Sequence, residues 1–99
     1  MKNTTYRECD EGWNSIIDPI VLLCDNNNVT ITQIKEKFGG LRIYTQGATE
    51  EIYCQIQEAC RLADRTCETC GEPGTIQIFG GFYKCQCSLH SEELKKKFN

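Results

Sequence analysis

Residues 67–90 read CETCGEPGTIQIFGGFYKCQCSLH and hold four cysteines and the only histidine of the 99-residue chain. Cys67 and Cys70 form a CxxC pair, and after sixteen intervening residues Cys87 begins a CxxH pair with His90. Zinc prefers four thiolate or imidazole ligands in a tetrahedron, and a spacer of two residues lets a tight turn direct both members of a pair at one ion. The paired spacing predicts that both pairs bind a single zinc ion.

The residues between the two pairs predict how they meet. Gly80-Gly81 separates two β-type runs, the pattern of a hairpin, and a final helix is expected from about Leu89 to Phe98. Knuckle, hairpin and helix in this order form a treble clef. Four protein ligands leave no coordination position for water or substrate, so the predicted zinc is structural. Cys85 remains an alternative third ligand, although Cys87 is favoured because it shares a helical turn with His90. A redox-active CxxC is disfavoured because no βαβ pattern precedes the motif.

The first third of the chain predicts an amphipathic helix that ends near Cys24. Its apolar residues recur at helical spacing: Trp13, Ile16, Ile17, Ile20 and Val21. Pro19 allows two interpretations: the helix kinks there, or a single turn at 12–17 precedes a helix capped by Asp18. Residues 1–9 are polar, and we expect them to be loosely held.

The segment VTITQIKEKFGGLRIYTQ predicts a hairpin whose two turn residues are Gly39-Gly40, so that Phe38 faces Leu41. One face of this hairpin then carries a group that we call the cationic patch: Lys35, Lys37, Arg42 and Tyr44. Three cations and a ring can hold phosphate or stack on a base. A solvated outer face of a sheet carries the same residue types and agrees better with the acidity of the chain.

A second helix is expected after Thr49, with Glu50 and Glu51 at the positive end of its dipole. It should end near Arg65 or Thr66, and its apolar residues form one stripe: Ile52, Ile56, Ala59 and Ala63. The sequence therefore predicts an α+β fold in one small domain, residues 1–99. Residues 1–66 form a portion with a helix, a hairpin and a second helix, and residues 67–99 form the zinc-binding portion.

Composition narrows the function classes. The net charge is −3, which disfavours extended nonspecific binding to nucleic acid. No apolar run reaches the ~18–20 residues of a membrane span, and the first residues lack the apolar stretch of a secretory signal. We therefore expect a cytoplasmic protein, in which eight cysteines need not form disulfides. Cys24 and Cys60 are interpreted as small buried hydrophobes. With His90 bound to metal, no histidine remains for acid–base work, and no enzymatic activity is expected.

Four motifs occur in an order that resembles a known group of proteins: GWxxII at 12–17, IKEKFGGLRIY at 34–44, CExCGxPG at 67–74 and CxxH at 87–90. The chain resembles small uncharacterised bacteriophage and bacterial proteins that share a KEKFGGLR segment and a cysteine knuckle. The resemblance implies a phage or bacterial cytoplasmic origin and a final ligand pair at Cys87 and His90. Pro19 and Cys85 depart from the pattern of that family.

These observations predict a zinc-stabilised accessory protein that binds and modulates or inhibits a protein complex of the host, for example a defence system. The first alternative is a nucleic-acid-binding treble-clef module that uses Lys35, Lys37 and Arg42. The second is a protein that sequesters a nucleotide signal through Lys35, Arg42 and Tyr44.

Overall fold

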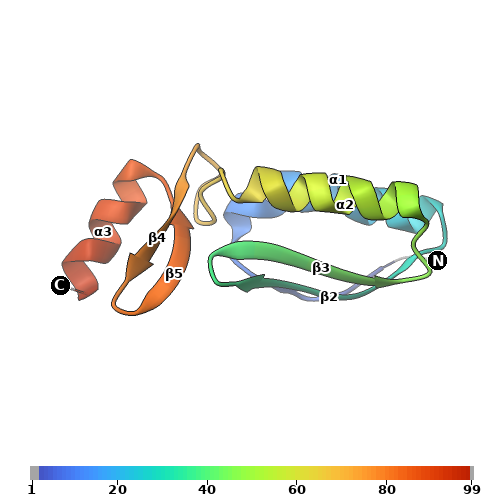
Figure 1. Cartoon of the computed structure of the whole chain (residues 1–99), viewed down its shortest axis with the longest axis horizontal. Coiled ribbons are helices and arrows are strands. Elements are labelled where there is room, and N and C mark those ends of the chain that lie inside the picture. Colours follow the sequence, from blue (N-terminus) through green and yellow to red (C-terminus); the bar gives the residue numbers. More distant parts are fainter. Residues whose placement is uncertain (1–2, 99) are drawn as a thin grey trace.

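A computed structural model describes residues 3–98 as an elongated α+β molecule of 45 × 19 × 18 Å. Two parts follow one another along its long axis (Figure 1). The elements are β1 (Arg7–Glu8), a 3-10 helix (Glu11–Trp13), α1 (Asn14–Asn26), β2 (Thr30–Lys37), β3 (Gly40–Gln46), α2 (Glu50–Ala63), β4 (Thr75–Phe79), β5 (Phe82–Gln86) and α3 (Ser88–Phe98). The predicted α+β class is confirmed. Within residues 3–98, no helix combines the length and apolarity needed to cross a bilayer.

The larger part is a two-layer sandwich. Helices α1 and α2 run antiparallel and cover one face of the sheet β1-β2-β3, while no helix or strand of residues 3–98 covers its other face (Figure 1). The predicted stripes face the sheet: Trp13 and Ile17 are fully buried from the helix side, as are Ile34 and Leu41 from the strands. Helix α2 begins as predicted, with the Thr49 side chain accepting a hydrogen bond from the Ile52 amide at 3.3 Å.

Helix α1 continues through Pro19. The interpretation in which a new helix begins at Asp18 is therefore wrong. A proline inside a helix has no N–H for the carbonyl four residues earlier, here that of Ser15, and such a position costs about 3 kcal/mol relative to alanine. Burial of Ile16, Ile17 and Ile20 around it offsets that cost.

The N-terminal segment is not loosely held within the part that the structure describes; residues 1–2 lie outside it. Arg7 and Glu8 pair in parallel with Ile34 and Lys35. Ahead of them, the Asn3 side chain donates to the Val29 carbonyl at 3.0 Å and accepts from the Ile31 amide at 2.8 Å. Side-chain hydrogen bonds that a polarity pattern does not reveal thus add a third strand to the sheet.

The β2–β3 turn lies one residue earlier than predicted. Lys37 pairs with Gly40, so the two turn residues are Phe38 and Gly39, both with positive φ (54° and 84°). An aromatic residue rarely adopts this conformation, which costs roughly 1–2 kcal/mol. Two contacts hold it: the Gly39 amide donates to Glu36 Oε2 at 2.8 Å, and the Phe38 ring packs edge-on against Tyr83 at 6.1 Å between centroids.

The smaller part consists of the cysteine knuckle, the β4–β5 hairpin and α3, as predicted. Gly80 and Gly81 form the two-residue turn, with φ of 53° and 93°. This part meets the sandwich at the tip of the β2–β3 hairpin and again where Gly12 donates its amide to the Glu68 carbonyl at 2.7 Å.

Candidate metal centre

Four side chains meet at the start of the C-terminal part. The ligand atoms of Cys67, Cys70, Cys87 and His90 all lie within 4.8 Å of one another. Cys70 Sγ and Cys87 Sγ are 3.8 Å apart, and His90 Nδ1 lies 3.7 Å from Cys67 Sγ and 3.2 Å from Cys87 Sγ. A tetrahedral zinc ion with bonds of about 2.3 Å to sulfur separates its sulfur ligands by about 3.8 Å. The four side chains therefore already occupy the corners of a site that can hold a metal ion.

Backbone geometry directs the sulfurs. The knuckle is closed by the Gly71 amide, which donates to the Cys67 carbonyl at 2.9 Å, and Gly71 has a φ of 85°. At the other pair, the His90 amide points at Cys87 Sγ at 3.5 Å because Cys87 directly precedes α3 and His90 lies in its first turn. The two-stranded hairpin between them returns the chain, so residues separated by more than twenty positions share one site.

The pKa values of the cysteine thiols show that backbone N–H groups stabilise thiolates at this site, while the close sulfurs repel one another when they are charged. The backbone N–H of His90 lowers the pKa of the Cys87 thiol to about 7. Burial works to raise the pKa of Cys67, but the N–H groups of Cys87, Cys70 and Thr69 lower it below the usual value. The N–H of Glu72 works to lower the pKa of Cys70, yet burial and the neighbouring sulfurs raise it. A divalent cation at the centre would relieve this repulsion between thiolates.

Cys85 does not belong to the group. Its side chain is fully buried, and its Sγ donates to the Asp64 carbonyl at 3.4 Å. Burial raises the pKa of its thiol to about 11, which disfavours the thiolate that a metal needs. The geometry thus brings together the favoured set, with Cys87 in place of Cys85. All eight cysteines are free thiols, and Cys54 is exposed on α2 whereas Cys24 is buried and Cys60 half-buried.

An ion-pair network around the buried carboxylate of Glu68 supports the knuckle from the side of the sandwich. Glu68 is only 2% exposed, and its carboxylate accepts from the Asp10 amide at 2.9 Å and from Lys84 Nζ at 3.1 Å. Lys84 Nζ also reaches Asp10 Oδ2 at 3.0 Å. Burial works to lower the pKa of Lys84, but these two carboxylates raise it above the usual value, so the lysine stays charged. The network fixes the knuckle to β5 and to the segment before α1.

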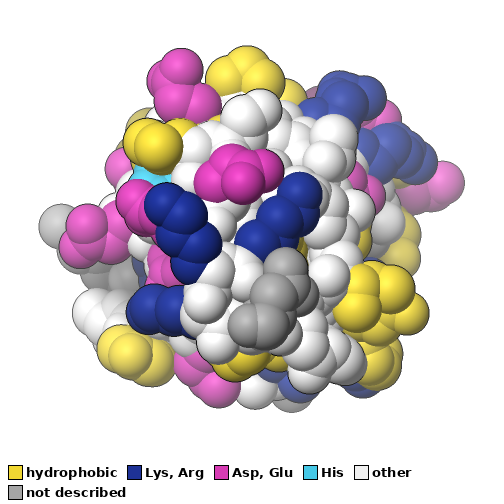
Figure 2. Space-filling view, turned by 90° about the vertical axis from the view of Figure 1, so that its left-hand side faces the viewer, with side chains coloured by type: hydrophobic (Ala, Val, Ile, Leu, Met, Phe, Trp, Pro, Cys, Tyr) yellow, Lys and Arg dark blue, Asp and Glu magenta, His cyan; other side chains and the backbone are white. Residues whose placement is uncertain are grey.

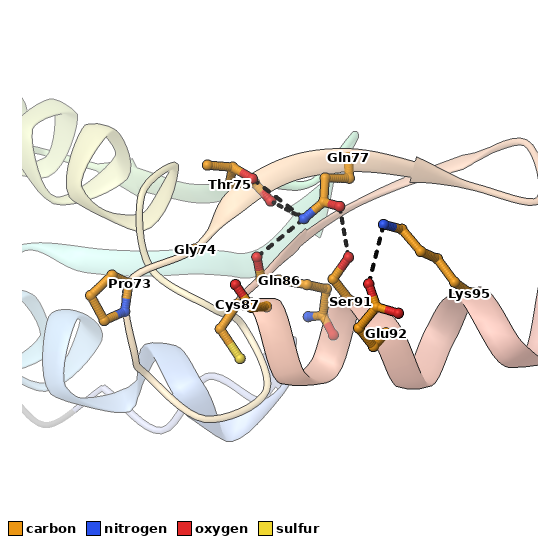
Figure 3. Close-up of a pocket in the computed structure, with 10 residues that line it drawn as sticks. Pro73, Gly74, Thr75, Gln77, Gln86, Cys87, Ser91, Glu92 and Lys95 are labelled. Carbon is orange, nitrogen blue, oxygen red and sulfur yellow. Dashed lines mark hydrogen bonds and ion pairs between the residues drawn. The ribbon is translucent and has the colours of Figure 1, made fainter.

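Polar contacts also fix α3, which carries His90. Ser91 is buried and donates from its hydroxyl to Gln77 Oε1 on β4 at 2.7 Å, while Gln77 Nε2 donates to the Gln86 carbonyl at 3.3 Å (Figure 3). These residues line a polar hollow of about 390 Å³ beside Cys87. The Gln86 side chain in turn donates to Thr69 Oγ1 in the knuckle at 3.1 Å. Both ligand pairs are thus bound to the same strand pair.

Sequence reasoning found the four ligands but missed these supporting residues: Gly12, Glu68, Gln77, Lys84, Gln86 and Ser91. Of these residues, only Glu68 could have been noticed in the sequence. It lies between two metal-ligand cysteines, where a carboxylate adds negative charge to a site already rich in thiolates. The other five depend on contacts between segments far apart in the chain, which spacing does not reveal.

The cationic patch lies on the β2–β3 hairpin of the sandwich and not at the metal centre. Lys35 pairs directly with Arg42, and Lys35 Nζ lies 5.9 Å from the centre of the Tyr44 ring. Because the turn lies one residue earlier than predicted, the β2 residues from Gln33 to Lys37 pair with β3 residues two positions earlier than expected. Side chains alternate between faces with a period of two, so the cationic patch residues still share one face: Lys35, Lys37, Arg42 and Tyr44. Figure 2, which faces the C-terminal part, shows Lys, Arg, Asp and Glu side chains intermixed there, with the histidine largely covered.

No protein-family model matches the chain, and no curated protein or solved structure shows a significant similarity to it.

Proposed function

We propose that this chain is a non-enzymatic binding protein whose C-terminal part is held by one structural zinc ion. The observation that carries the proposal is that four ligand atoms lie within 4.8 Å of one another, with Cys70 Sγ and Cys87 Sγ at the 3.8 Å expected for two sulfurs on one zinc ion. Three thiolates and an imidazole suit zinc, and four protein ligands close its coordination sphere. The only histidine is one of these ligands, so it is withdrawn from acid–base chemistry.

Metal analysis tests the first half of this proposal. Cys70 and Cys54 are both exposed, and only Cys70 belongs to the site. We expect one zinc ion per chain in the native protein and in Cys54→Ser, but loss of the ion in Cys70→Ser, measured by native mass spectrometry. Cobalt substitution should give the visible absorption of a tetrahedral thiolate site. Native protein that binds no stoichiometric metal would contradict the proposal.

A groove along the two helices supports a protein partner. Two adjoining hollows of about 400 and 570 Å³ share Ile20 and Glu58 and follow the antiparallel pair α1–α2 on its outer side. Their lining is mainly apolar and includes Leu62, which is 47% exposed, and its charged members are Glu51, Glu58 and Arg65. A partner helix with an apolar stripe flanked by Lys or Arg complements this groove in shape and charge.

The resemblance to phage and bacterial proteins makes a protein complex of the bacterial host, such as a defence system, the first partner to test. We expect zinc-loaded protein to capture a stoichiometric host protein. Leu62→Glu, inside the groove, should abolish this capture. Leu22→Glu should not, because Leu22 is 61% exposed on α1 and lies outside the groove lining. Equal capture by both variants would show that the groove is not the docking surface.

A further inference from the structure

The open face of the three-stranded sheet has a character that the rest of the chain does not share. In β2 and β3, the outward residues are Gln33, Lys35, Lys37, Arg42, Tyr44 and Gln46. In the N-terminal segment, exposure alternates and leaves Tyr6 and Glu8 outward, with Glu8 level with Lys35 and its carboxylate 3.3 Å from Gln33 Nε2. The face thus holds three cations and one carboxylate, although the whole chain carries −3.

Acidic side chains that contribute to the net negative charge of the chain lie away from this face. Asp18, Glu50, Glu51 and Glu58 belong to the helical layer on the other side of the sheet, and Glu68 is buried beside the knuckle. Charge is therefore separated across the sandwich. Within a Debye length of about 8–10 Å, an anionic ligand senses the near face rather than the net charge of the molecule.

Aromatic rings stand among these cations. Tyr44 is 44% exposed, Tyr6 is 80% exposed, and Phe38 at the end of the hairpin is 65% exposed. Lys35 Nζ lies 5.9 Å from the Tyr44 ring centre, and Lys37 Nζ lies 5.7 Å from that of Phe38. A cation that close to a ring allows one nucleotide to place its phosphate on the lysine and its base on the aromatic face.

We propose that this open sheet face binds single-stranded nucleic acid. Paired bases are stacked inside a duplex and offer no free face to a tyrosine, so a polynucleotide that uses both the rings and the cations must be single-stranded. The inference does not depend on the helix groove, because the face lies on the side of the sheet away from α1 and α2 (Figure 1).

Fluorescence anisotropy with labelled oligonucleotides of about 15 nucleotides tests the proposal. The arms are single-stranded DNA, single-stranded RNA and duplex DNA at low and rising salt, with vesicles of anionic phospholipid as a competing polyanion. We expect the single strands to bind more tightly than the duplex. The ratio between the DNA and RNA arms then tells which strand is preferred.

Variants separate stacking from charge. Tyr44→Leu should weaken single-strand binding by about 5- to 150-fold and leave the salt slope unchanged. The double variant Lys35→Gln, Arg42→Gln should reduce the slope of log affinity against log salt by about 1.4. Lys96→Gln, Lys97→Gln removes the same charge from α3, at the other end of the molecule, and should change neither quantity.

Each contrary result overturns the proposal: undetectable binding of single strands at low salt, equal binding of duplex and single strand with Tyr44→Leu unaffected, equal weakening by the α3 control, or binding of vesicles alone. Retained zinc and unchanged circular dichroism confirm that each variant is folded. A failed capture experiment on the helix groove leaves this test intact, since the two surfaces carry separate variants.

Discussion

Gly12 lies directly against Glu68, with its amide 2.7 Å from the Glu68 carbonyl oxygen. A Cβ placed on Gly12 would stand 2.3 Å from that oxygen and 2.3 Å from the carbonyl oxygen of Cys67. These are backbone atoms of the knuckle, so they yield only if the knuckle moves. The close approach makes the N-terminal part and the metal centre one packed unit, although more than fifty residues separate them in the chain.

Replacing Gly12 by alanine should therefore lower the free energy of unfolding by about 1–3 kcal/mol, the usual cost of forcing extra volume into a packed contact. Urea denaturation of zinc-loaded protein measures it, followed by fluorescence of the only tryptophan, Trp13, whose Nε1 donates to the Thr66 carbonyl at 2.9 Å. Gly40→Ala is the control, because its Cβ would meet a movable Asp64 side chain at 3.3 Å and the Lys37 carbonyl oxygen at an ordinary contact distance of 3.6 Å. Equal losses in the two variants would contradict this account of Gly12.

The buried carboxylate of Glu68 predicts a second effect on stability. Glu68→Gln removes the charge that Lys84 Nζ and the Asp10 amide contact, and it should cost about 1–3 kcal/mol. Glu58→Gln is the matched change on the surface, where Glu58 pairs with Arg61 in an exposed contact worth less than about 0.5 kcal/mol. Zinc content should not change in either variant, since neither residue is a ligand. A Glu68→Gln variant as stable as Glu58→Gln would show that the network adds nothing.

How far the fold could be predicted depended on whether the deciding contacts were local. The helix stripes and the second hairpin follow from periodicity and paired glycines, and both were confirmed. The first hairpin shows the limit of such patterns. A turn at Gly39-Gly40 and one at Phe38-Gly39 leave every residue on the same face, so the apolar pattern cannot distinguish them. The turn at Phe38-Gly39 is the one in which Phe38 contacts Tyr83, forty-five positions later in the chain.

The same distinction holds for the metal centre. Its ligands can be predicted from their spacing, because two cysteines, or a cysteine and a histidine, at i and i+3 indicate metal binding without any knowledge of the fold. The residues that position those ligands follow no recognisable spacing in the sequence. Ser91, Gln77 and Gln86 are ordinary polar side chains whose role exists only once β4, β5 and α3 are packed together.

Thiol reactivity should separate the remaining cysteines. Burial, with a smaller contribution from Glu68, raises the pKa of Cys9 to about 11, so its thiolate is scarce near neutral pH. In zinc-loaded protein at about pH 8, iodoacetamide should modify exposed Cys54 first and leave Cys9 unmodified. The rate at Cys9 should then rise about tenfold per pH unit up to its pKa. Peptide mapping by mass spectrometry measures both sites, and early modification of Cys9 at pH 8 would contradict its half-buried position.

The choice between Cys85 and Cys87 as ligand depends on where a strand becomes a helix. Residues two apart in a strand point to the same face, so a longer β5 would direct both sulfurs to the same side. The chain instead leaves β5 at Gln86 and enters α3 at Ser88. Cys85 therefore stays in the core, whereas Cys87 turns toward His90.

Cys87→Ala should consequently lose the zinc ion. Cys85→Ala should keep the ion and lose only packing, at a cost of about 1 kcal/mol for the buried sulfur. Native mass spectrometry gives the metal content, and competition with a chromogenic chelator gives the affinity. Retention of zinc by Cys87→Ala together with its loss from Cys85→Ala would mean that β5 continues past Gln86 when the ion binds. In that case the position of His90 at the start of α3 would also be wrong, because both ligands depend on the same junction.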